Sequence, residues 1–174
     1  KTFKIEPPTK EITCLIVDKW TGHIKKVSLR YNRPNNFSDD YTIKAGEVSG
    51  GLGVYRGWAI FDISNIESNA KIEKVEIEIR CDETADGESS TLYVTRIRRD
   101  PRLASSSGDW KDIYNEMDDE IYGTQNLNDD TSDTYIIELD AVQDFQTAVD
   151  IHKSVIFIGF REASEDKKRI MIDG

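Results

Sequence analysis

Four aromatic residues are the best candidates in this sequence for contacts with a ligand: Trp20, Trp110, Tyr114 and Tyr41. An exposed flat ring packs on the apolar face of a sugar, and its polar tip forms hydrogen bonds. Trp20 and Trp110 stand at the edges of predicted loops, where a ring can reach a ligand. The alternative is that such rings fill the core, which is what we expect of Trp58 in its predicted strand.

The segment 126–133 is the best candidate for a metal site. It offers side-chain oxygens at Asn126, Asn128, Asp130 and Asp133, and Ca²⁺ prefers several hard oxygen ligands. The match to an EF-hand loop is poor, because Thr131 stands where that loop needs a glycine. A solvated acidic loop is the alternative, so no cofactor is certain and Ca²⁺ is the one that the sequence suggests.

The two cysteines, Cys14 and Cys81, both fall in predicted strands. They are either two buried small hydrophobic residues or one disulfide, which would imply an oxidising compartment. Asn36 begins an Asn-Phe-Ser triplet, the acceptor pattern for N-glycosylation, which has meaning only in an exported protein.

Familiar catalytic motifs are missing from the sequence. The two histidines, His23 and His152, belong to no zinc-binding motif, and no serine stands in a nucleophile elbow. With 33 acidic residues, some pair will meet the spacing of glycosidase carboxylates by chance. We therefore expect no enzyme, while the sequence leaves a glycoside hydrolase or lyase open.

The charge balance narrows the partners. The chain has 23 Lys and Arg against 33 Asp and Glu, a formal net charge of −10. This argues against nucleic acid and anionic lipid, which are bound largely through Lys and Arg. The apolar runs are too short for membrane insertion. Polysaccharide, or other copies of the chain, fits this composition better.

Strict alternation in residues 71–81 is the strongest structural signal. Val75, Ile77, Ile79 and Cys81 fall on one face of a strand, with charged residues between them. Successive side chains of a strand point to opposite faces, so one face lies on a core and the other in water. The segment predicts an antiparallel β-sheet.

Further strands are predicted at 12–17, 24–31, 41–48, 55–64, 91–98, 134–139, 154–161 and 169–172, with a turn at Thr21 and Gly22 and another at 50–53. Trp110, Ile113, Met117 and Ile121 are spaced for a short helix, and 142–149 predicts a second one. About nine strands at this spacing favour an all-β, antiparallel sandwich of the jelly-roll type. Residues 1–11 form an extended N-terminal segment, and 12–174 form a single domain. The chain begins without Met, so we take it for a mature form or an excerpt.

One stretch resembles a known family. It combines a Tyr-Arg start at Tyr55, a Phe-Asp-Ile-Ser segment at 61–64, a small-residue turn and the alternating strand. These features, with 35–46, 135–146 and 155–161, are similar to the DNRLRE-type domain over about residues 31–172, with a gap at 99–133. Phe145 stands where a Trp is common, the acidic 109–133 insert departs from the pattern, and the family's usual further strand is missing at Asp173. The resemblance implies a jelly-roll-like module on exported microbial surface proteins; relatives accompany archaeal disaggregatase and are grouped with carbohydrate-binding modules.

Two functions follow. The first is a non-catalytic, exported module, extracellular or at the cell surface, that binds polysaccharide or cell-surface glycan. The second is a structural subunit of a surface layer, extracellular filament or virion spike, assembled by strand complementation between copies. A missing final strand would leave an open sheet edge, and a neighbour's extended segment could fill it with Thr2, Phe3, Lys4, Ile5 and Glu6.

Overall fold

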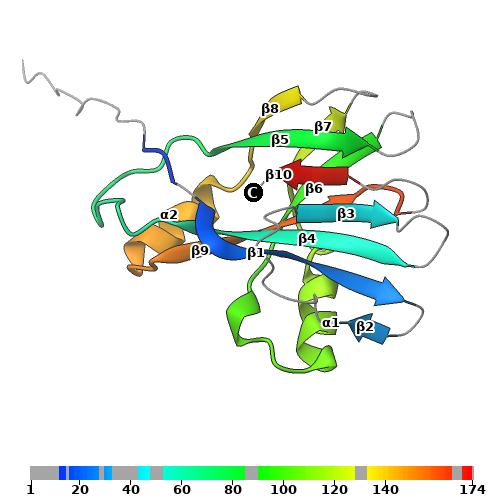
Figure 1. Cartoon of the computed structure of the whole chain (residues 1–174). Coiled ribbons are helices and arrows are strands. Elements are labelled where there is room, and N and C mark those ends of the chain that lie inside the picture. The colour runs from blue at the N-terminus through cyan, green and yellow to red at the C-terminus, as the bar shows by residue number, and fades with distance from the viewer. Residues whose placement is uncertain are drawn as a thin grey trace, which may run out of the picture.

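Ten antiparallel strands and two α-helices make up the part of the chain that the structure, a computed structural model, describes (Figure 1). That part comprises residues 12–14, 16–27, 30–32, 43–47, 53–84, 90–127, 133–165 and 170–173. The strand candidates Thr2 to Glu6 lie outside it, as do Asn36, Tyr41, Asn128 and Asp130.

The strands form two facing sheets. The larger sheet has the order β2 (Arg30–Asn32), β1 (Ile16–Val27), β4 (Val54–Asp62), β9 (Val155–Glu162), β6 (Ser90–Arg96), β7 (Ile121–Leu127). The smaller sheet has the order β3 (Ile43–Glu47), β10 (Ile170–Asp173), β5 (Glu76–Thr84), β8 (Asp133–Glu138). Strand β3 joins them, because its last residues pair with β4 and its first with β10.

This topology is a jelly roll. The orders 3-10-5-8 and 4-9-6-7 are those of the two sheets of an eight-stranded jelly roll. Strands β1 and β2 are added beside β4 at one edge. The predicted all-β antiparallel sandwich is therefore confirmed.

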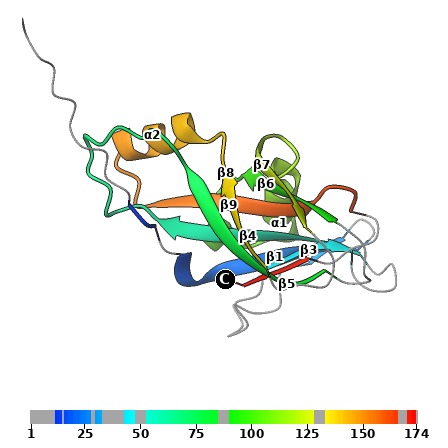
Figure 2. The same cartoon turned by 90° about the horizontal axis from the view of Figure 1, so that it is seen from above.

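The helices lie outside the sandwich. Helix α1 (Ser107–Glu116), with the short 3-10 turn η1 (Pro101–Leu103) before it, belongs to the connection between β6 and β7. It packs on the outer face of the larger sheet, on the side away from β5 and β8 (Figure 1). Helix α2 (Val142–Asp150) lies at the end of the sandwich where β4 ends and β9 begins (Figure 2).

Strand β5 confirms the alternation read from the sequence. Ile77, Ile79 and Cys81 are buried between the sheets, while Glu76, Glu78 and Arg80 are exposed. The outer face of the smaller sheet is therefore polar along β5, as a sheet with one solvated face should be.

Strand β4 is apolar on both faces. Trp58, Ala59 and Ile60 are successive residues, and none is more than 1% exposed. Ala59 packs in the core between the sheets, whereas Trp58 and Ile60 pack under α1. The continuous apolar run at 58–61 follows from a central strand that is covered on both sides, and the core position predicted for Trp58 is confirmed.

Local hydrogen bonds set the start of α1. The Ser106 side chain accepts from the backbone N–H of Asp109, and the Asp109 carboxylate accepts from the backbone N–H of Ser106 at 2.8 Å. This reciprocal capping box satisfies N–H groups that a helix leaves unpaired at its first turn. The helix predicted from Trp110 to Ile121 was too long. Helix α1 ends at Glu116, and Ile121 lies in β7 with 43% of its surface exposed.

Two predictions about the strands were wrong. Thr21 and Gly22 lie inside β1, where an irregularity in register between Ile16 and Thr21 takes the place of a turn. Strand β7 was missed because Ile121–Leu127 lacks a regular apolar alternation. The strand predicted at 169–172 is confirmed as β10, which pairs with both β3 and β5.

Within the described residues, no helix has the length and apolar character needed to cross a bilayer.

Candidate functional site

Two of the predicted ligand-binding aromatics are core residues. Trp110 is 2% exposed and Tyr114 is 1% exposed, and both pack between α1 and the larger sheet. The spacing that predicts the helix also places these rings on its apolar face, so the prediction of exposed stacking rings was wrong for both. Trp20 lies in β1, with its side chain outside the description, and Tyr41 lies outside it entirely.

A strip of polar and aromatic residues crosses the outer face of the larger sheet beside the C-terminal end of α1. We call it the outer strip, and it consists of Lys26 on β1, Arg56 on β4, Arg161 on β9 and Tyr93 on β6, joined by Tyr31, Asp118 and Glu165. Tyr93 and Arg161 are direct partners in the pairing of β6 with β9. The sheet thus fixes the spacing of the strip.

Arg56 anchors the strip. Its side chain is 4% exposed, and its guanidinium lies 4.0 Å from the centre of the Tyr114 ring. It donates to Glu165 Oε1 at 2.6 Å, to the Tyr114 carbonyl at 2.6 Å and to Asp118 Oδ1 at 2.9 Å. Burial alone would lower the pKa of Arg56, but the hydrogen bonds to Glu165 and Asp118 raise it above the ordinary value. Arg56 therefore stays charged and ties α1 to the sheet.

The buried carboxylate of Glu162 holds the turn that positions Glu165. Glu162 is 3% exposed and accepts from the backbone N–H and the hydroxyl of Ser164, both at 2.8 Å, and from the Ser90 hydroxyl at 3.2 Å. These bonds hold the turn after β9, in which Glu165 takes a left-handed φ of 56°. The turn brings the Glu165 carboxylate onto Arg56.

Arg161 is a largely buried cation of the strip, with its side chain 13% exposed and its Nε 3.7 Å from Asp118 Oδ1. Its Nε donates to the Met117 carbonyl at 3.1 Å, and its guanidinium lies 4.7 Å from the centre of the Tyr93 ring. In the described part of the chain, neither of its terminal nitrogens has a hydrogen-bond partner. A guanidinium held at one edge and stacked on a ring presents the rest of its fork in a fixed orientation.

Lys26 supplies a second cation. Its Nζ lies 5.9 Å from the centre of the Tyr31 ring and 5.5 Å from that of Tyr114, and it pairs with no carboxylate among the described residues. Tyr31 and Tyr93 are half-buried. The outer strip thus combines partly exposed rings, donors on Arg161 and Lys26, and acceptors on Asp118 and Glu165.

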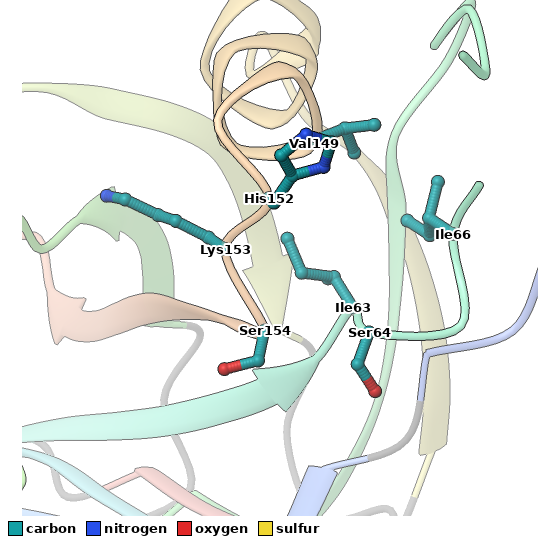
Figure 3. A pocket seen from close by; sticks show the side chains of 7 residues that line it. All are labelled: Ile63, Ser64, Ile66, Val149, His152, Lys153 and Ser154. Atoms are coloured by element: carbon teal, nitrogen blue, oxygen red, sulfur yellow. The ribbon is translucent and has the colours of Figure 1, made fainter. Parts of the chain in front are cut away.

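A shallow pocket lies at the other end of β4. Ile63 and Ile66 after β4, with Val149 of α2, form its apolar part, and the His152 ring lies beside them (Figure 3). The Lys153 side chain points away from it (Figure 3). No carboxylate lines this pocket, so it lacks the paired acids of a glycosidase.

The proposed disulfide is not formed. Cys14 and Cys81 are not bonded to each other, and of the two small residues expected to be buried, Cys81 is buried and Cys14 is half-buried. Cys81 lies in the core, and the Sγ of Cys14 is 4.0 Å from Asn65 Oδ1. Burial, and next the charge of Asp62, raise the pKa of the Cys14 thiol.

Two of the four candidate calcium ligands, Asn126 and Asp133, lie in the described part of the chain. The Asn126 side chain accepts from the Thr91 hydroxyl at 2.9 Å, and Asp133 begins β8. Within the ranges given above, no group of three or more His, Cys, Asp or Glu residues could hold a metal ion. The site therefore stays a prediction.

No family model matches this chain, and no curated protein matches it. The resemblance to DNRLRE-type domains stays a prediction from the sequence.

The sequence reasoning missed Arg56 and Arg161. A signal was present for Arg56, which stands in a strand whose next residues are Gly57, Trp58, Ala59 and Ile60. An arginine in a strand that is buried on both faces needs carboxylate partners. Nothing in the sequence says that these are Asp118 and Glu165.

Proposed function

We propose that this protein is a non-catalytic, exported jelly-roll module that binds polysaccharide at or outside a cell surface through the outer strip. The observation that carries the proposal is the Arg161 guanidinium, stacked on Tyr93 with its terminal nitrogens free in the described part of the chain. Sugar hydroxyls accept from guanidinium groups and donate to carboxylates, and the apolar face of a sugar packs on tyrosine rings. The strip offers all three kinds of contact on a fixed sheet.

The same strip argues against hydrolysis. Asp118 and Glu165 are its two carboxylates, and Arg56 binds both. A glycoside hydrolase needs one carboxyl group as a general acid and the other as a base or nucleophile. Both groups are already engaged by one cation, which fits a role in holding a surface and not in breaking a bond.

Binding can be tested with the full chain by affinity electrophoresis and calorimetry on xylan, galactomannan, polygalacturonate and chitin oligosaccharides. We expect Tyr93→Ala and Arg161→Ala each to weaken binding about tenfold, the loss of roughly one good contact. Lys153→Ala, an exposed cation at the other end of the sandwich, is the matched control and should bind like the wild type. Failure to bind every member of this panel, or equal binding by all variants, would count against the proposal.

Assembly through β1 is a second candidate, and it has its own observation. Strand β2 pairs with β1 only from Lys25 to Val27, so among the described strands none pairs with Ile16 to Ile24 on the edge away from β4. An unpaired edge is a template for another chain's strand. We expect sedimentation of the full chain to show association that deletion of residues 1–11 abolishes. A strict monomer at high concentration would remove this candidate.

A further inference from the structure

The layer between α1 and the larger sheet contains several polar atoms that are buried without a partner. In the described part of the chain, Trp58 Nε1, Trp110 Nε1, Tyr114 OH and Thr95 Oγ1 are buried and make no hydrogen bond. Trp58, Trp110 and Tyr114 belong to the apolar cluster under α1. Such groups are rare in folded proteins, and each calls for a physical explanation.

Thr95 belongs to the same layer. A Cβ built on Gly159 would lie 2.5 Å from Thr95 Oγ1 and 2.9 Å from Met117 Cγ, so the Thr95 hydroxyl and the end of α1 meet above Gly159. Gly159 pairs with Trp58 on one side and with Thr95 on the other. Thr95, Gly159 and Trp58 therefore form one row across the sheet.

This row continues the outer strip. Tyr93 and Arg161 form the neighbouring row, two residues further along β6 and β9. Two residues of a strand span roughly 7 Å. A ligand on the outer strip would reach the Trp58 row if α1 were not above it.

Helix α1 can move away from the larger sheet without disrupting the pairing of any strands. It lies in the connection between β6 and β7, and its capping box is local to residues 105–109. Its C-terminal end is held by Arg56, which bonds the Tyr114 carbonyl and Asp118, and by Arg161, which bonds the Met117 carbonyl. The backbone N–H groups of Arg98 and Arg99, which follow β6, also donate to Glu116. Each unpaired buried polar atom lowers the equilibrium constant for closing by about tenfold.

We infer that α1 is a cover that opens as a unit, and that the Trp58 row beneath it is a hidden part of the ligand site. A sugar ring is the ligand that suits this row, because it would pack on the indole of Trp58 and offer hydroxyls to the polar atoms left unpaired in the closed form. The identity of the ligand rests on the proposed function, whereas the opening of α1 does not.

Native-state hydrogen exchange on the full chain tests the opening without any ligand. We expect the amides of residues 111–116 to be at least a hundredfold less protected than those of β4 and β9, and to depend less on added urea, because a local opening exposes less surface. Equal protection and equal urea dependence in α1 and β4 would show that α1 opens only with the whole fold. That result would overturn the inference.

The substitution Thr95→Val tests the link to binding. Valine keeps the shape of the side chain and removes the unpaired hydroxyl. The closed form should therefore become more stable, and the protection of the α1 amides from hydrogen exchange should rise about tenfold. If the ligand needs the open form, its affinity should fall by the same factor. Thr134→Val is the matched control, because Thr134 is exposed on the smaller sheet and should change neither quantity.

The outcomes separate the two claims. Lower protection of α1 in Thr95→Val would mean that the hydroxyl is satisfied in the closed form, and this overturns the cover. Suppose that Thr95→Val raises the protection of α1 but binds the same polysaccharide as tightly as the wild type does. That outcome would overturn the hidden site. Absence of wild-type binding to all four polysaccharides refutes the proposed function, while the exchange measurement still decides whether α1 opens.

Discussion

The substitution Arg56→Met removes the anchor between β4 and α1 while keeping a long apolar stem. Arg56 is 4% exposed and bonds three acceptors, namely Glu165, Asp118 and the Tyr114 carbonyl. Breaking a fully buried ion pair costs about 3–5 kcal/mol. The side chains of Asp118 and Glu165 are 52% and 23% exposed, so both carboxylates regain part of their hydration when the arginine is lost. We therefore expect a loss of about 2–3 kcal/mol in the free energy of unfolding.

Urea denaturation followed by circular dichroism measures this loss. For a chain of this length, 1 kcal/mol corresponds to about 2–4 °C in Tm, so thermal unfolding should shift down by roughly 4–12 °C. Arg98→Met is the matched control, because Arg98 also bridges two carboxylates, Asp119 and Glu120, but is itself 47% exposed. An exposed bridge of this kind contributes about 1 kcal/mol or less. Equal losses in the two variants would refute the reasoning that burial, and not the number of partners, gives Arg56 its weight.

The remaining predictions concern α1, the sheet and the thiols. The capping bonds, first that from the Ser105 backbone N–H, lower the pKa of Asp109 from 3.8 to about 2. Because the folded pKa lies below the ordinary one, the cap is intact above pH 3.8 and is lost as the pH falls toward 2. An NMR titration of the Asp109 carboxyl group should show this. Gly159→Ala should cost about 1–3 kcal/mol in urea denaturation, since its Cβ would lie 2.5 Å from the Thr95 hydroxyl. Gly108→Ala, with its nearest atom at 3.5 Å, should instead stabilise by roughly 0.5 kcal/mol. A thiol assay in denaturant should count two free thiols, and in the native protein the buried Cys81 should react far more slowly than the half-buried Cys14; a count of zero would contradict the structure.

Much of the fold could be predicted from local patterns. The alternation in 75–81 predicted the sidedness of β5, and the spacing of Trp110, Ile113 and Met117 predicted α1. These predictions succeed because one buried face imposes a period on the sequence. The end of α1 was misplaced because Ile121 continues the apolar spacing although the chain has already entered β7.

The candidate site was much harder to predict. An exposed ring and a buried ring look alike in a sequence, so Trp110 and Tyr114 were assigned to a ligand although they fill the space under α1. The outer strip joins residues from five strands with Asp118 and Glu165, which lie far apart in the chain. Contacts of this kind leave no local period, so no pattern predicts them.

The amino-acid order by itself determined that this chain makes antiparallel sheets with one solvated face, because side-chain polarity repeats with the geometry of a strand. Only the tertiary structure decided which face of the larger sheet is covered, and by what. Helix α1 settles on that face because its apolar side and the outward side chains of β4 bury each other, and Arg56 then finds its carboxylates at the margin of that contact. Those choices depend on which distant surfaces meet, and a linear sequence does not carry that information in any local form.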